Sequence, residues 1–385
     1  MKYNQLLFVI ICFSITTLSD AMNSENNSLD KFLEITAVED PLCAKYITNE
    51  TIVITSEGLN EYGCTFIDLK KEKIQHISNF CDNSRYTVIP CLQIHNKKII
   101  NSLGKRLTIY NAETGLQERS IPVKQLIQSF ACDLSSNIFL CYGLCYDGGA
   151  DVITKYNYIT NDTVDISILG SCCYIISKHP KEEIMCIADH EGNISLHKLD
   201  DTLSKFNTIP LPKLRCNFCQ YSPDGSYIVV GGGKKLFIID QNINTNAYPC
   251  LEAEGNERYC NIAFHPNNLV LATLSRYEPL LLHVRTKQVV NFWDIKTQRF
   301  IDSMPALDFD RGYDLSFSPD GLEIIIVLEG KCVRAPVPFA VEAKIYNEKK
   351  CQYLLFILHQ LIKEANLPED IMSYCGNILW KTFAL

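Results

Sequence analysis

Short apolar runs alternate with polar turns along most of the chain. Residues 216–240 give the clearest example, because an apolar run that ends at Tyr221 is followed by a Ser-Pro-Asp-Gly turn. Two further apolar runs follow, at residues 227–230 and 235–239. Proline presets φ at a central turn position, and glycine adopts backbone angles that other residues avoid. The stretch therefore predicts three consecutive strands joined by tight turns.

The same pattern recurs through the chain. Pro180, Pro223, Pro266 and Pro319 follow one another at intervals of 43, 43 and 53 residues, and an apolar run comes after each of them. Repeats of this length with several short strands each are typical of a β-propeller. Weaker turn signals that extend the series to seven lie near Asn49, Asn96 and Ser136. We predict an all-β, seven-bladed β-propeller over residues 22–346, with six or eight blades as alternatives.

Three motifs carry a resemblance to a known family. Tyr221-Ser-Pro-Asp-Gly225, Phe317-Ser-Pro-Asp-Gly321 and Asn291-Phe-Trp-Asp-Ile295 resemble the WD-repeat family, most clearly over residues 172–333. The resemblance implies a divergent ring of four-stranded blades. The Gly-His pair of that family is absent, and one Trp-Asp dipeptide remains. The family's buried His/Asp hydrogen-bond network is therefore not carried over.

A closed ring needs its two chain ends joined, since an unpaired strand edge favours aggregation. Residues 32–38 alternate apolar and polar positions and could complete the last blade from the N-terminal side. Residues 340–346 could do the same from the C-terminal side. We favour closure by the N-terminal segment.

The N-terminus has the pattern of a secretory signal. Lys2 gives a charged start, residues 6–13 are unbroken apolar sequence, and Ser19-Asp20-Ala21 offers small residues for cleavage. We expect residues 1–21 to be removed near Ala21 and the protein to be secreted or periplasmic. The alternative is that this stretch forms a buried first strand of a cytosolic protein. No later segment is apolar for long enough to cross a bilayer, so we expect no membrane insertion after signal removal.

Composition narrows the classes of partner. The chain of 385 residues is 47% hydrophobic and 21% charged, which suits a globular protein with a sizeable core. Its net charge is −8 and it has no basic stripe, so nucleic-acid binding is not expected.

Eighteen cysteines are a high count for any compartment. Cys173, Cys216 and Cys260 each precede a turn proline by six or seven residues, which places them in the innermost strand of their blades, where we expect them to pack as small apolar residues. One to three disulfides are expected besides, with partners that the sequence does not assign. Cys216 and Cys219 have metal-ligand spacing, but residues three apart on a strand face opposite ways, so we predict no metal site.

Two loops are candidates for a functional site. The sixth repeat carries an insertion at residues 276–288, whose Tyr277, Leu281, His283 and Arg285 are candidate partner-binding residues. The alternative is a lengthened hairpin that packs on its own blade. The acidic segment 308–314 lacks the ligand series of a calcium loop. We expect it to be a solvated loop between blades.

Residues 347–385 have helical spacing instead of the strand pattern. Two helices are predicted, over residues 351–365 and from about Pro368 onward, and they form a C-terminal helical tail. Leu367, Pro368, Ile371 and Trp380 are candidate contact residues, either for capping the propeller or for binding a partner. Leu367-Pro-Glu-Asp-Ile371 faintly resembles an F-box, which implies a ubiquitin-ligase adaptor as a further alternative.

Catalytic motifs are absent from the sequence. It has no nucleophile elbow, phosphate loop or zinc-protease helix, and its histidines are scattered. His179 and His265 precede turn prolines and are expected to be turn residues. The sequence favours a non-catalytic, monomeric scaffold without cofactors that binds an unidentified protein. A propeller enzyme of the lactonase or hydrolase type remains the alternative, because a fold does not determine a function.

Overall fold

The structure of this chain is a computed structural model. The chain divides into two units, Met1–Leu33 and Glu34–Leu385. Within the first unit, the structure describes Leu33. The residues that the structure describes are 33–35, 41–57, 62–71, 73–79, 91–95, 97–103, 106–123, 127–132, 137–142, 152–167, 173–189, 192–200, 202–209, 211, 214, 216–241, 250–253, 255–277, 286–307, 311–338, 341 and 345. The predicted signal segment 1–21 and the predicted helical tail 347–385 lie outside the described residues.

The described strands form seven four-stranded sheets. In six of them, four strands consecutive in the chain lie side by side in sequence order, as a propeller blade requires. The strands are β1 (Leu33–Ile35), β2 (Pro41–Thr48), β3 (Thr51–Glu57), β4 (Tyr62–Asp68), β5 (Lys73–Asn79), β6 (Cys91–His95), β7 (Lys98–Leu103), β8 (Arg106–Asn111), β9 (Gln117–Pro122), β10 (Ile127–Cys132), β11 (Asn137–Tyr142), β12 (Val152–Asn157), β13 (Thr163–Ser167), β14 (Cys173–Lys178), β15 (Ile184–Asp189), β16 (Ile194–Lys198), β17 (Lys205–Ile209), β18 (Phe218–Tyr221), β19 (Tyr227–Gly232), β20 (Lys235–Asp240), β21 (Cys250–Glu252), β22 (Glu257–Phe264), β23 (Val270–Tyr277), β24 (Lys287–Asp294), β25 (Phe300–Ser303), β26 (Gly312–Phe317), β27 (Glu323–Leu328) and β28 (Lys331–Pro336).

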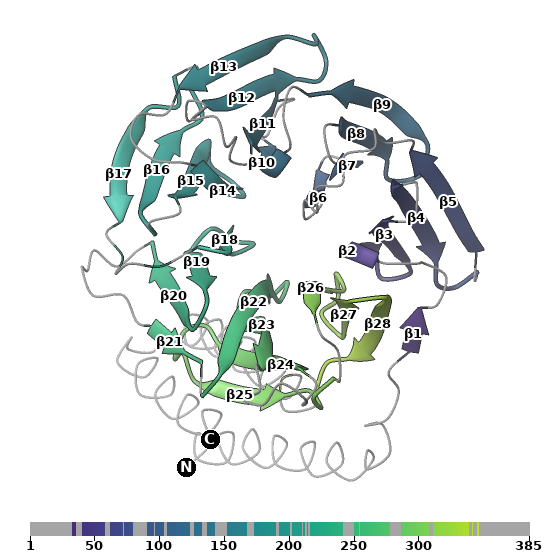
Figure 1. Ribbon diagram of the computed structural model, residues 1–385, viewed down its shortest axis with the longest axis vertical. Coiled ribbons are helices and arrows are strands. Elements are labelled where there is room, and N and C mark those ends of the chain that lie inside the picture. Colours follow the sequence, from purple (N-terminus) through teal and green to yellow (C-terminus); the bar gives the residue numbers. More distant parts are fainter. Residues whose placement is uncertain are drawn as a thin grey trace, which may run out of the picture. The chain divides into compact units, whose positions relative to one another are not determined.

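The seven sheets of the second unit stand in a ring (Figure 1). We number the blades in chain order, from blade 1 (β2–β5) to blade 7 (β26–β28 with β1). The innermost strands are β2, β6, β10, β14, β18, β22 and β26. The seventh sheet has the order β1-β28-β27-β26, so the strand from the N-terminal side completes the last blade. The predicted seven-bladed propeller is confirmed, and so is closure from the N-terminal side.

Each junction between neighbouring blades holds its own apolar cluster. Between blades 6 and 7, for example, Phe292 packs with Leu315 and Ile324, and all three are buried. Between blades 7 and 1, Val327 packs with Ile52. Seven clusters serve the seven junctions. The ring is therefore held together mainly by apolar side chains buried between sheets.

The turns between the first and second strands also contact each other. His265 of blade 6 lies against the turn of blade 7, where its Nε2 atom is 3.1 Å from the carbonyl oxygen of Gly321. Its ring also contacts Phe317 edge-on, at a centroid distance of 5.0 Å. His179 of blade 4 packs in the same way on Tyr221 of blade 5, at 5.1 Å. Both histidines are turn residues, as predicted, and each also joins two blades.

Asparagine side chains join the remaining turns of this series. The backbone N–H of Asp224 in blade 5 donates to Oδ1 of Asn268 in blade 6, at 3.2 Å. The N–H of Asp320 in blade 7 donates to Oδ1 of Asn49 in blade 1, at 3.0 Å. Each of the two Ser-Pro-Asp-Gly turns, in blades 5 and 7, is thus contacted by side chains from both neighbouring blades. These side chains come from the turns of blades 4 and 6 for blade 5, and from those of blades 6 and 1 for blade 7.

The predicted placement of three cysteines in innermost strands is confirmed for two of them. Cys173 begins β14 and Cys260 lies in β22, both innermost strands. Cys216 instead precedes β18, and it is buried in the same apolar cluster as Cys219. The expectation that these two side chains face opposite ways was wrong, because the alternation of a strand does not extend to a residue that lies before it.

Candidate functional site

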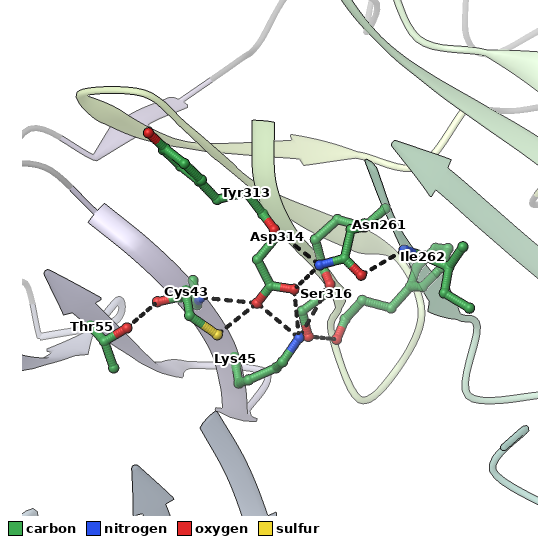
Figure 2. A network of polar contacts seen from close by, with 11 residues as sticks. Cys43, Lys45, Thr55, Asn261, Ile262, Tyr313, Asp314 and Ser316 are labelled. Carbon is green, nitrogen blue, oxygen red and sulfur yellow. Dashed lines mark hydrogen bonds and ion pairs between the residues drawn. The ribbon is translucent and has the colours of Figure 1, made fainter. Parts of the chain in front are cut away.

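The inner strands of three blades meet at a buried carboxylate (Figure 2). Asp314 of β26 is 5% exposed. Its Oδ2 atom accepts a hydrogen bond from the thiol of Cys43 at 2.8 Å and from the backbone N–H of Ala44 at 3.3 Å. Its Oδ1 atom accepts from Nζ of Lys45 and from Nδ2 of Asn261, each at 3.0 Å. We call Cys43, Lys45, Asn261 and Asp314 the inner polar cluster.

The cluster joins blade 7 to both of its neighbours. Cys43 and Lys45 come from β2 of blade 1, and Asn261 comes from β22 of blade 6. Asn261 also donates from Nδ2 to the carbonyl oxygen of Tyr313, at 3.0 Å. The Lys45 ammonium is 2.9 Å from the second Asp314 oxygen, and the Lys45 side chain is 29% exposed. The carboxylate is therefore paired, as a buried charge must be.

Backbone irregularities place these side chains. The pairing register shifts between Pro41 and Cys43 in β2, between Tyr259 and Asn261 in β22, and between Gly312 and Asp314 in β26. A bulge adds one residue to a strand and re-aims the side chains next to it. Comparable shifts occur in β10 and β14. The cluster thus rests on a feature common to several inner strands.

Burial keeps the thiol of Cys332, close to this cluster, protonated. Burial, and then the charge of Asp314, raises the pKa of Cys332 to about 12. The thiol of Cys43 donates a hydrogen bond to the same carboxylate. A thiol in such surroundings is a poor nucleophile, because the thiolate is the reactive form. The arrangement suits a brace between blades.

The sequence analysis missed Asp314 because it lies at the end of an acidic segment. The expectation of a solvated loop over residues 308–314 was wrong for Asp314, which is buried within β26. The signal that could have found it is its place in the repeat. Asp314 lies three residues before Phe317, and Asn261 lies three residues before Phe264. Aligning the repeats on these aromatic residues puts the two polar residues in register.

The predicted partner-binding residues fall mostly outside the described part of the chain. Leu281, His283, Arg285, Leu367, Pro368, Ile371 and Trp380 lie outside the described residues. Tyr277 is described: it ends β23 and is 41% exposed. It pairs with Glu257 on one side and with Lys287 on the other.

The sixth repeat has a longer hairpin than its neighbours. β23 and β24 have eight residues each, and their pairing continues from Val270↔Asp294 to Tyr277↔Lys287. The first and last two residues of the predicted insertion therefore belong to strands, which corrects its bounds. The His265 turn leads into the start of β23, and Tyr277 is at the end of the same strand. Because β23 and β24 are antiparallel, the Tyr277 end of this hairpin lies on the face of the ring opposite the His265 turn.

Among the residues that the structure describes, no group of three or more histidine, cysteine or acidic side chains could hold a metal ion. Within the same residues, no helix is long and apolar enough to span a membrane.

Comparisons with known proteins identify the fold. No family model matches the chain, and no curated protein matches it. Among solved structures, the chain is similar to the β-propeller domain of Cps50 (Swd1) from Myceliophteria thermophila, with a TM-score of 0.63 and 7% sequence identity. The similarity covers 80% of this chain and 98% of that domain. The fold is thus that of a WD-repeat-like, seven-bladed β-propeller.

Proposed function

We propose that this protein is an exported, non-catalytic scaffold that binds another protein through the face of the ring at the Tyr277 end of the β23–β24 hairpin. The observation that carries the proposal is the exposure of Tyr277 at the end of this lengthened hairpin. Tyrosine is enriched in protein interfaces, since it combines a large apolar ring with a polar tip.

The rigidity of the ring supports this role. Apolar clusters fill the junctions between blades, and on the opposite face the turn of His265 contacts the turn that contains Gly321. A partner that binds a rigid surface orders little of it, so less conformational entropy is lost on binding. The hairpin end can vary in sequence without disturbing the braced turns on the other face.

The chemistry of the inner strands supports binding over catalysis. A general acid or base must reach a substrate and exchange a proton with it. Asp314 is buried, and both of its oxygens accept hydrogen bonds from neighbouring blades. Its carboxylate is therefore engaged in holding blades 1, 6 and 7 together.

Site-specific photo-crosslinking tests the proposed surface. A photoreactive amino acid would replace Tyr277 in one variant and Phe206 in another, because Phe206 is a similarly exposed aromatic residue, 48% against 41%, on the outer strand β17. We expect a discrete crosslinked protein from position 277 and none from position 206. Y277S should then weaken binding of the purified partner at least tenfold, while F206S leaves it unchanged. Equal crosslinking from both positions would exclude this surface.

Export is tested separately. The full-length chain would be expressed in a secretory host, and the N-terminus of the protein in the medium or periplasm would be sequenced. We expect it to begin at Met22, directly after the predicted cleavage site. Retention of Met1 in the cytosolic fraction would contradict export and leave the partner-binding surface untouched. Deleting residues 347–385 tests the ubiquitin-ligase alternative, which requires that segment for partner capture.

A further inference from the structure

Two cysteines of neighbouring blades have their sulfur atoms in contact. The Sγ atoms of Cys186 in β15 and Cys219 in β18 are 3.4 Å apart. Both residues are buried, and they belong to the apolar cluster between blades 4 and 5. This is a sulfur–sulfur contact across a blade junction, and neither of these two cysteines is in a disulfide in the structure.

We propose that Cys186 and Cys219 are a site of covalent cross-linking, at which an interblade disulfide forms when the protein folds in the presence of a small-molecule disulfide. A disulfide has a sulfur–sulfur distance of about 2.05 Å. The two sulfur atoms therefore need to approach by little more than an ångström. Cys186 lies in the second strand of blade 4 and Cys219 in the innermost strand of blade 5, so a cross-link between them fastens one sheet directly to the next.

The reaction is a pair of thiol–disulfide exchanges. The thiolate of one cysteine attacks the small disulfide, which forms a mixed disulfide and releases one small thiolate. The thiolate of the second cysteine then attacks the protein sulfur of the mixed disulfide and releases the other. Two electrons pass from the two protein thiols to the small disulfide, and the two thiol protons go to the released thiolates.

The burial of the two cysteines determines at which stage of folding the disulfide forms. The Cys186 thiol and burial both raise the pKa of Cys219 well above its ordinary value. Few thiolates are then present in the folded protein, and a small disulfide has little access to them. The exchange is therefore fast while blades 4 and 5 come together during folding and slow once their junction has closed.

The cross-link closes a segment of 33 residues in the chain. Such a link lowers the conformational entropy of the unfolded chain and so favours the folded state. For a chain of this size we expect the oxidised protein to melt roughly 5 °C above the reduced one.

Peptide mapping of the natural chain tests the proposal. The full-length protein would be refolded in a mixture of reduced and oxidised glutathione, alkylated and digested without reductant. We expect mass spectrometry to find a peptide that joins Cys186 to Cys219, and this result would support the proposal. Alkylation of both residues as free thiols, or pairing of Cys219 with Cys216, would overturn it. Neither result depends on a variant that folds.

Variants measure the effect of the link. The readout is the difference in Tm between the oxidised and the reduced form of the same protein, which is insensitive to a general loss of stability. We expect C186S and C219S each to reduce this difference, and by the same amount. C332S is the matched control, because Cys332 is buried but lies near Asp314, and it should retain the difference. A difference as large in C186S as in the natural chain would overturn the assignment.

Discussion

The Nε2 atom of His265 lies 3.1 Å from the carbonyl oxygen of Gly321, 56 residues further along the chain. The other ring nitrogen, Nδ1, accepts a hydrogen bond from the backbone N–H of Asn267, at 3.2 Å. A neutral ring that accepts at Nδ1 carries its proton on Nε2, so Nε2–H donates to Gly321. One imidazole thus stabilises its own turn and fastens it to the next blade.

This contact predicts that a side chain at position 321 destabilises the folded protein. A Cβ atom at this position would lie 2.0 Å from Nε2 of His265, and the backbone φ is +80°. We expect G321A to lower the free energy of unfolding by about 2–5 kcal/mol, from backbone strain and overpacking together. Urea unfolding measures this change.

Gly330 is the matched control for that substitution. Its φ is +75°, but a Cβ atom there would have nothing within 4 Å. We expect G330A to cost about 1 kcal/mol from backbone strain alone. If both variants lost the same stability, the turn contact would contribute nothing and the first prediction would be refuted.

The sequence predicted the blades better than their connections. The spacing of Pro180, Pro223, Pro266 and Pro319 located four turns, because proline and glycine fix local backbone angles. Contacts such as that of His265 with Gly321 were missed, since they depend on how two repeats are placed in space. Asp314 was missed for the same reason, because its burial depends on donors that lie 53 and about 270 residues away in the chain.

His179 predicts a loss of stability at acid pH. Burial is the largest cause that lowers the pKa of His179 from the ordinary value of 6.5, and the charges of Lys178 and Lys181 lower it further. The charge of Glu182 and a hydrogen bond to the backbone of Gly225 raise it and so offset part of this shift. The unfolded chain then binds more protons than the folded protein between the two pKa values. The free energy of unfolding therefore rises with pH through this window, and stability is lost as the pH falls below 6.5.

The geometry gives the same sign for His179. Its Nδ1 atom accepts hydrogen bonds from the backbone N–H groups of Lys181 and Glu182, at 3.2 and 2.9 Å, and a proton on Nδ1 removes both. Urea midpoints at pH 7.5 and 5.5 measure the effect. We expect H179Q to show a smaller difference between the two midpoints, and the remainder to include His197, whose pKa burial also lowers. An unchanged difference in H179Q would contradict the assignment.

The contacts of the inner polar cluster predict that substitutions of its two charged members, Asp314 and Lys45, lower the free energy of unfolding by different amounts. In D314N the Lys45 ammonium loses its counter-charge, and an amide nitrogen faces donors that need an acceptor. We expect a loss of about 2–4 kcal/mol in the free energy of unfolding, since leaving buried polar groups unpaired is costly. K45M should cost less, because the Lys45 side chain is 29% exposed and the carboxylate keeps its bonds to Cys43, Ala44 and Asn261.

A double-mutant cycle separates this pairing from the rest of the cluster. K45M should cost less in the D314N background than in the natural protein, because the ion pair is already absent there. The exposed pair of Lys97 and Glu113 is the matched control, with side chains 80% and 66% exposed, and E113Q should leave urea unfolding unchanged within error. If D314N behaves like E113Q, the buried carboxylate does not brace blades 1, 6 and 7. The inner polar cluster would then no longer support the proposal of a non-catalytic scaffold, because a carboxylate that does not stabilise the fold could serve in catalysis.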